Sequence, residues 1–217
     1  MSALVLTTLG GLWACLWTRK WRALGAAPLA AGLVLAALSQ PPDILVDQDG
    51  KMVAVRHAAG GLSISGRSGT FVAQRWLRRD GQPASLPWPK DGISSDGWLR
   101  CDNISCLYAP RVGDRSTALV ALVRKEYALP EDCRAATVVV SMTPARRRCP
   151  SARVVVDRFD LWRKGAHAVW LRPDGPIVRS AQDFRGDRPW TRKRDTNRTT
   201  RPVAAGSQPV LAAQKRS

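Results

Sequence analysis

The stretch CRAATVVVSMTPARRRCPSARVVVDRFDLWRKGAHAVWLR, residues 133–172, carries the strongest structural pattern in the chain. Three apolar, β-branched runs in it predict strands over Thr137–Ser141, Arg153–Val156 and His167–Leu171. After the second run, Asp157 is placed to cap a short helix over Arg158–Lys164, which Gly165 would end. Strands that alternate with turns and a compact helix indicate a small α/β domain.

The residues before this stretch predict further strands and two helices. Asp49-Gly50 separates two short apolar segments, and this dipeptide favours the tight turn of a β-hairpin. Thr70–Arg79 has helical spacing, and Pro130 suits the first turn of another helix. Other strands are predicted over Leu62–Ser65, Trp98–Cys101, Cys106–Tyr108 and Thr117–Val123. The pattern therefore predicts a soluble α/β, or α+β, domain over residues 43–184.

Two uncharged apolar runs, residues 2–17 and 23–40, precede this domain. Both are short for membrane helices, which need about 20 residues and tolerate about 17. Three tryptophans cluster around the basic linker at residues 18–22, as aromatic residues do at membrane–water interfaces. We therefore predict a transmembrane helical hairpin over residues 1–40, with the linker cytoplasmic and the domain on the far side. A cleavable signal peptide and a buried helical pair are the alternatives, disfavoured by the uncharged first run and by the lack of a polar face.

Positive charge is abundant and unevenly distributed. The net charge is +17, and residues 43–184 contain 22 basic and 15 acidic side chains. Residues 185–217 contain nine basic and two acidic side chains, which predicts a basic, largely disordered tail. Such a balance favours polyanionic partners, either nucleic acid or anionic lipid headgroups. A coding bias towards arginine and alanine would produce the same tail.

Four of the five cysteines form two close pairs in the sequence, Cys101/Cys106 and Cys133/Cys149. Four cysteines allow three connectivities. A Cys101–Cys106 bond would close a hairpin, and a Cys133–Cys149 bond would tie a short helix to the loop after the next strand. The spacing lacks the close CxxC pairs of structural zinc sites, so we predict no metal site. Disulfides would agree with a periplasmic or extracellular domain.

No pattern in the sequence predicts catalysis. His57 and His167 do not have metal-ligand spacing, and GxSxG, GxxxxGK and GxGxxG motifs are absent. His57 is expected in an exposed, glycine-rich stretch and His167 in the core or at a strand edge. Asp157 and Asp160 share one helical turn, where capping and surface pairing explain them. We therefore expect no enzyme activity and no cofactor.

Basic and aromatic side chains remain as candidates for binding. The candidates for phosphate contacts are Arg75, Arg78, Arg79, Arg146, Arg147, Arg148, Arg192, Lys193 and Arg194. The candidates for base stacking are Trp88, Trp98, Trp162 and Trp190. Phosphate contacts are independent of base sequence and sensitive to salt, which suits a protein that holds any DNA. Solvated arginines and core tryptophans are the simpler interpretation.

An ordered set of motifs resembles the C-terminal end of ComEC-type competence proteins, and most of all those of alphaproteobacteria. The set is PPDILVDQDGKMVAVR, CDNISC, LPEDCRAATVVVS, RRRCPSARVVVDR and GAHAVWL, and the resemblance covers roughly residues 1–190. ComEC proteins are polytopic inner-membrane channels that carry single-stranded DNA into the cell during natural transformation. In many members the soluble C-terminal domain resembles a metallo-β-lactamase fold with nuclease-like metal ligands.

The resemblance implies two transmembrane helices, a small degenerate metallo-β-lactamase-like domain and a basic tail. The HxHxDH metal motif of the family has no counterpart here, and neither do its other spans and its N-terminal periplasmic domain. The chain would thus be a C-terminal fragment in the bacterial inner membrane, with a periplasmic, metal-free domain that contacts single-stranded DNA or braces the remaining channel. The alternatives are a divergent nuclease that binds metal through Asp102, Asp157 and Asp160, or an inactive remnant of a truncated gene.

Overall fold

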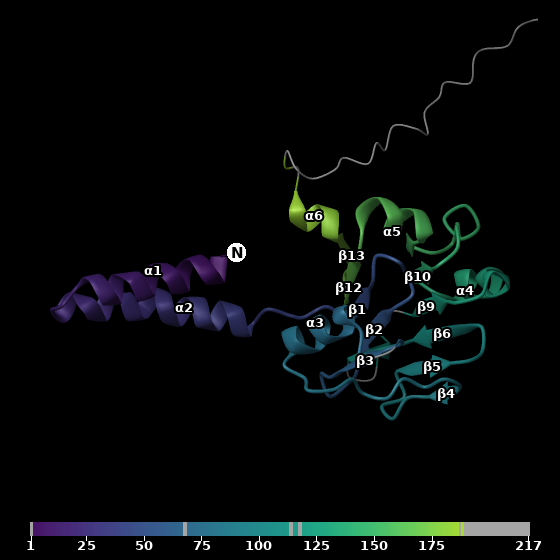
Figure 1. Ribbon diagram of the computed structural model, residues 1–217, viewed down its shortest axis with the longest axis horizontal. Helices are drawn as coiled ribbons and strands as arrows, with labels where there is room; N and C mark the ends of the chain where they lie inside the picture. The colour runs from purple at the N-terminus through teal and green to yellow at the C-terminus, as the bar shows by residue number, and fades with distance from the viewer. Residues whose placement is uncertain (1, 67–68, 113–114, 117–118, 187, 189–217) are drawn as a thin grey trace, which may run out of the picture.

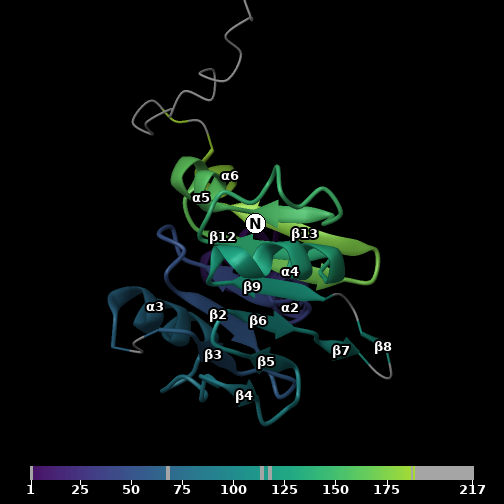
Figure 2. The same cartoon turned by 90° about the vertical axis from the view of Figure 1, so that its right-hand side faces the viewer.

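The computed structural model describes all residues except 1, 67–68, 113–114, 117–118, 187 and 189–217. A helical hairpin extends from a mixed α/β domain that contains two large sheets (Figure 1). The two sheets pack face to face, and helices lie on their outer faces (Figure 2). The prediction of a mixed α/β domain is therefore confirmed.

The first sheet is antiparallel throughout, with strand order β13-β12-β1-β2-β3. Its strands are β1 (Ile44–Val46), β2 (Val53–Arg56), β3 (Leu62–Ile64), β12 (His167–Arg172) and β13 (Gly175–Ser180). The Asp-Gly signal is confirmed, since Gly50 has φ +68° in the turn between β1 and β2. The last strand, β13, was not predicted.

The second sheet is mixed, with strand order β11-β10-β9-β6-β5-β4. Its strands are β4 (Gly92–Ile93), β5 (Leu99–Cys101), β6 (Ser105–Tyr108), β9 (Val120–Val123), β10 (Val138–Ser141) and β11 (Val154–Val156). The pairs β9–β10 and β10–β11 are parallel, and the other neighbours are antiparallel. A separate two-stranded ribbon consists of β7 (Arg111–Val112) and β8 (Arg115–Ser116).

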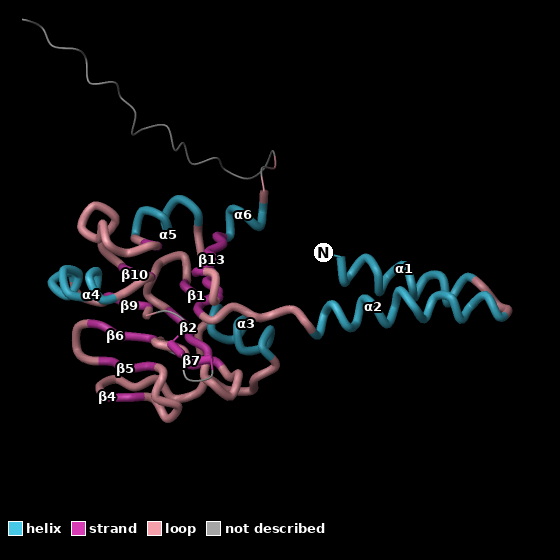
Figure 3. The backbone as a smooth tube through the Cα atoms, turned by 180° about the vertical axis from the view of Figure 1, so that it is seen from behind, coloured by secondary structure: helices cyan, strands magenta, loops and turns pink. Residues whose placement is uncertain are grey.

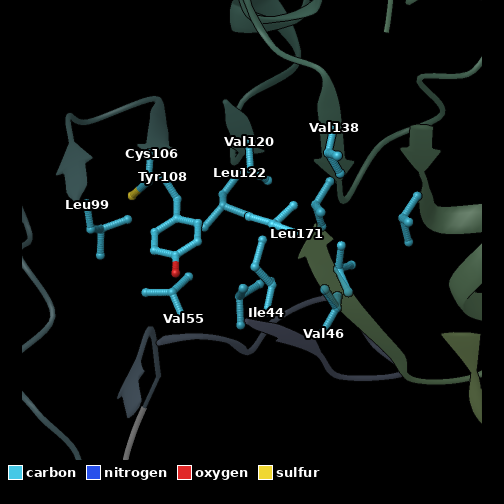
Figure 4. Close-up of a cluster of buried hydrophobic side chains, with 14 of the residues drawn as sticks. Ile44, Val46, Val55, Leu99, Cys106, Tyr108, Val120, Leu122, Val138 and Leu171 are labelled. Atoms are coloured by element: carbon cyan, nitrogen blue, oxygen red, sulfur yellow. The ribbon is translucent and has the colours of Figure 1, made fainter. Parts of the chain in front are cut away.

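The main core lies between the two sheets (Figure 4). Ile44 and Val55 of the first sheet meet Leu99, Tyr108 and Val138 of the second, and all five are almost fully buried. Successive side chains along each strand point alternately into this core and towards the outer face of the sheet. Both faces of each sheet therefore carry β-branched residues. Burial of these side chains is the main stabilising term of the domain.

Each outer face is covered by one helix. Helix α3 (Phe71–Asp80) packs Ala73 and Leu77 on the first sheet, begins at the cap Thr70 and ends at Gly81. On the second sheet lies α4 (Leu129–Ala135), preceded by the 3-10 helix η2 (Glu126–Ala128). Two further short helices, α5 (Arg158–Lys164) and α6 (Ala181–Arg185), lie near each other beyond the strand ends (Figure 1).

The prediction of two transmembrane helices over residues 1–40 is wrong. Helix α1 (Ser2–Leu16) has 15 residues and α2 (Ala26–Ala37) has 12, with the 3-10 helix η1 (Lys20–Gly25) between them (Figure 3). At about 1.5 Å per residue α1 is about 22 Å long, whereas a bilayer core is about 30 Å thick. No helix in the described part of the chain is both long and apolar enough to cross a membrane.

Glycines allow the two helices of the hairpin to approach closely. A Cβ atom on Gly10 would lie 2.6 Å from the backbone nitrogen of Leu29, and one on Gly32 would lie 2.8 Å from the carbonyl oxygen of Ala3. Any larger residue would therefore push the backbones apart. The sequence signal that we interpreted as two membrane spans corresponds to an apolar hairpin built on small-residue contacts.

Candidate nucleic-acid interface

The loop between β10 and β11 carries three of the predicted arginines, Arg146, Arg147 and Arg148. One carboxylate holds this loop in place. Asp157 Oδ2 accepts hydrogen bonds from the backbone N–H groups of Ala145 and Arg146, both at 3.3 Å. Its other oxygen, Oδ1, accepts from the first turn of α5. Asp157 is buried, so a single side chain fixes the loop relative to α5.

A cysteine pair fixes the other end of the loop. Cys133 of α4 and Cys149 lie at disulfide distance, with their Cα atoms 5.1 Å apart. Ser151 Oγ donates a hydrogen bond of 2.6 Å to the carbonyl oxygen of Cys133. The second pair, Cys101 and Cys106, also lies at disulfide distance and faces across the β5–β6 hairpin. Both predicted close pairs are thus observed, and each links neighbouring elements.

The three loop arginines are exposed, and two of them form ion pairs. Arg146 donates from one guanidinium nitrogen to both carboxylate oxygens of Asp160, at 2.8 and 3.0 Å. Arg148 pairs with Glu126 of η2. Asp160 is buried, so a phosphate that took Arg146 from it would leave a buried carboxylate without its cation. Both partners of the Arg148–Glu126 pair are exposed, and such pairs contribute about 0–1 kcal/mol, so a phosphate can compete for the Arg148 guanidinium at little cost. Arg147 lies between Arg146 and Arg148 on the loop surface.

The α3 arginines do not join this loop. Arg75, Arg78 and Arg79 are exposed on α3, which covers the first sheet, whereas the arginine loop lies beside α5 and α4 (Figures 1 and 2). Arg75 stacks its guanidinium 5.8 Å from the centre of the Phe71 ring. The remaining candidates, Arg192, Lys193 and Arg194, lie outside the described residues. The predicted basic residues therefore form two separate surfaces.

The predicted stacking residues divide in the same way. Trp88 and Trp98 are partly buried and pack against the core between the sheets, so they are structural. Trp162 is exposed on α5. Trp190 lies outside the described residues. The sequence analysis missed Phe159, which is also exposed on α5, although the spacing of Phe159 and Trp162 within one short helix would have placed both rings on one side.

His57 occupies a different environment from the one predicted. It is buried, not exposed, because its Nδ1 atom lies 3.1 Å from Asp96 Oδ2 and joins the β2–β3 turn to the β4–β5 turn. Ser94 Oγ also bonds to this carboxylate, at 2.5 Å from Asp96 Oδ1. A catalytic triad would place the serine hydroxyl on the imidazole instead. The cluster therefore fits a structural bridge between the two sheets. His167 is buried, as predicted, and its Nδ1 contacts the carbonyl oxygen of Gly165.

The carboxylates of the nuclease alternative are used in local structure. Asp102 Oδ1 accepts from the backbone N–H groups of Ile104 and Ser105, at 2.8 and 2.6 Å, and so forms the β5–β6 turn. Asp157 and Asp160 cap α5 in a reciprocal capping box. Within the residues that the structure describes, no group of three or more histidine, cysteine or acidic side chains is placed to hold a metal ion.

Asp132 gives the domain a pH dependence. Burial raises the pKa of this carboxyl in α4, and the charges of Asp102 and Glu131 raise it further. The folded chain therefore binds this proton more tightly than the unfolded chain does, and stability rises as the pH falls through the raised pKa. We expect Asp132→Asn to increase the free energy of unfolding at pH 7 and to lose this advantage near pH 4, as measured by urea denaturation across pH. An unchanged pH profile would contradict this expectation.

Comparison of the chain with protein-family models, with curated proteins and with solved structures finds no match.

Proposed function

We propose that the chain is the C-terminal module of a ComEC-like DNA-uptake protein and that it contacts DNA without catalysing a reaction. The observation that carries the DNA contact is the exposed arginine loop, Arg146–Arg148, held at one end by Asp157 and at the other by the Cys133–Cys149 pair. A preorganised loop loses little conformational entropy when it binds a phosphate backbone. Guanidinium groups bind phosphate in a fork geometry that suits any nucleotide sequence.

The motifs behind the resemblance fall on structural junctions of the domain. CDNISC forms the β5–β6 turn, and LPEDCRAATVVVS runs from α4 into β10. RRRCPSARVVVDR runs from the arginine loop through β11 to the cap of α5. The motifs that carry the resemblance are therefore those that form this turn, the α5 cap and the Cys133–Cys149 pair.

The proposal also includes a location and a partner. Two cysteine pairs at disulfide distance favour an oxidising compartment, which for a ComEC-like domain is the periplasm. There the module would lie against the remaining membrane part of a ComEC-like channel and receive incoming single-stranded DNA. A binding role is favoured over a nuclease role, because the carboxylates of Asp102, Asp157 and Asp160 already accept hydrogen bonds in a turn and a helix cap.

The test is DNA binding by the full chain across salt concentrations. We expect fluorescence anisotropy to show that the chain binds a labelled 20-nucleotide strand. The logarithm of the association constant should fall linearly with the logarithm of the KCl concentration. Replacing Arg146, Arg147 and Arg148 together with glutamine should weaken binding about tenfold or more and lower the salt slope by about 2, at about 0.7 per lost phosphate contact.

The matched comparison is the same charge change on α3, with Arg75, Arg78 and Arg79 replaced by glutamine. A larger loss from the α3 variant would move the interface to that surface. If the wild-type protein shows no salt-dependent binding to the strand, the proposed DNA contact is wrong. Magnesium-dependent degradation of the strand in the same samples would favour the nuclease alternative.

A further inference from the structure

The outer face of α5 carries two exposed aromatic rings between two arginines. At about 100° per residue, Arg158, Trp162, Phe159 and Arg163 follow one another in that order across one side of the helix. Phe159 is 49% exposed and Trp162 is 59% exposed, although large rings are usually covered. We refer to these four residues as the α5 face.

The opposite side of α5 anchors the helix to the domain. Leu161 is buried in the core between the sheets, and Asp160 is buried and holds Arg146. Asp160 is the only acidic residue of α5, and it lies on the side of the helix away from the α5 face. The capping box at Asp157 and the contact of α5 with α6 fix the helix further (Figure 2).

The rings and the guanidinium groups of the α5 face are arranged as one surface. The Arg163 guanidinium lies 5.8 Å from the centre of the Phe159 ring, so charge and π-surface are presented together. Arg146 of the arginine loop lies beside the same helix through its pair with Asp160. The neighbouring helix α6 adds an exposed ring, Phe184, and an exposed cation, Arg185. The arginine loop and α6 are thus both neighbours of the helix that carries the α5 face.

We propose that the α5 face binds single-stranded nucleic acid, with bases stacked on Phe159 and Trp162 and phosphates held by Arg158 and Arg163. This inference rests on the proposed DNA contact and specifies its mode. Every base has a π-face that can stack on an aromatic ring, but in a duplex those faces are already stacked on one another. The α5 face should therefore select single strands, whereas the arginine loop alone would bind any polyanion.

The composition of the face favours this partner over a lipid surface. A helix that lies in a membrane interface needs a broad apolar side, rich in leucine or similar residues, opposite its charges. In α5 the single aliphatic residue, Leu161, points into the core, and the rings are flanked closely by charge. Two adjacent rings between two guanidinium groups instead match stacked bases with phosphates on either side.

The experiment measures binding of the full chain to labelled 20-nucleotide single strands and to the matching duplex. We expect Phe159→Ala and Trp162→Ala each to weaken single-strand binding about tenfold while leaving duplex binding and the salt slope nearly unchanged. Trp162→Phe should restore most of the affinity, whereas Trp162→Leu should not, because only an aromatic ring stacks. Phe71→Ala, which removes the ring from the equivalent phenylalanine–arginine pair on α3, should stay within twofold of wild type.

The outcomes separate this inference from the proposed function. If the wild-type protein binds no DNA, both the proposed function and the role of the α5 face are wrong. Wild-type protein that binds single strands, with the two alanine variants unchanged, overturns the α5 face and leaves the arginine loop in place. Alanine variants that lose binding to phosphatidylglycerol vesicles but keep single-strand affinity overturn it in favour of a lipid surface. Circular dichroism of each variant verifies that the fold is intact, as expected for exposed positions.

Discussion

Asp157→Ala should lower the free energy of unfolding by about 3–4 kcal/mol. The loss of the α5 cap accounts for about 1 kcal/mol of this. The remainder arises because the N–H groups of Ala145 and Arg146 lose their acceptor, and a buried, unsatisfied donor costs about 1–3 kcal/mol. Asp157 is buried, so water cannot easily replace the carboxylate. Asp157 accepts four backbone hydrogen bonds in all.

Urea denaturation of the full chain, followed by tryptophan fluorescence, measures the loss. Ser180→Ala is the matched control, since Ser180 and Asp183 form a second capping box that serves only its own helix, α6. That variant should lose about 1 kcal/mol. Hydrogen exchange at the amides of Ala145 and Arg146 should accelerate in Asp157→Ala and stay slow in Ser180→Ala. Equal losses in the two variants would show that Asp157 does not hold the arginine loop.

Local sequence signals predicted the elements whose ends depend on one or two residues. Asp157 and Gly165 bound α5 as expected, and Asp49-Gly50 makes the β1–β2 turn. Such signals work because caps and tight turns depend on local hydrogen bonds and on the backbone freedom of glycine. Strand order depends instead on contacts between distant residues. The pairing of β1 with β12 joins residues more than 120 positions apart, and no local pattern encodes it.

Two elements show where local patterns fail. Strand β13 begins at Gly175-Pro176 and is only half-buried, so it lacks the alternating apolar pattern that identifies strands. For the N-terminal runs the pattern predicted too much, because their hydrophobicity suggested two membrane spans. The turn at η1 shortens both helices, and the glycines at their contact pack them against each other. Hydropathy measures composition and does not reveal where a helix ends.

The candidate site was predictable in its chemistry and not in its geometry. The sequence identified Arg146–Arg148 as basic, but their support by Asp157 comes from a residue after the next strand. Phe159 was missed because the exposed side of α5 becomes evident only once Leu161 is known to face the core. His57 was predicted to be exposed, but it is buried against Asp96. That partner lies in a turn of the other sheet, which the sequence around His57 does not reveal. Tertiary contacts decide all three cases.

Tyr108→Ala should be the most damaging single substitution in the core, with a loss of about 3–5 kcal/mol. Tyr108 is the largest of the fully buried side chains and reaches from β6 towards Val55 of the other sheet (Figure 4). Its hydroxyl donates a hydrogen bond of 2.8 Å to the carbonyl oxygen of Arg56, and its ring packs edge-on against Trp98. Burial, with Asp43 and Asp96 nearby, raises the pKa of Tyr108 well above its usual value, so the hydroxyl keeps its proton.

Tyr108→Phe separates the hydrogen bond from the packing. It keeps the ring and removes the donor to Arg56, so the expected loss is about 1–2 kcal/mol. Urea denaturation of both variants gives the two terms, and the difference between them is the cost of the cavity. Because the bond joins the two sheets beside the His57–Asp96 bridge, hydrogen exchange in Tyr108→Phe should increase first in the β2–β3 turn. Losses of equal size in the two variants would mean that the sheets are held together at this edge by the hydroxyl and not by the ring.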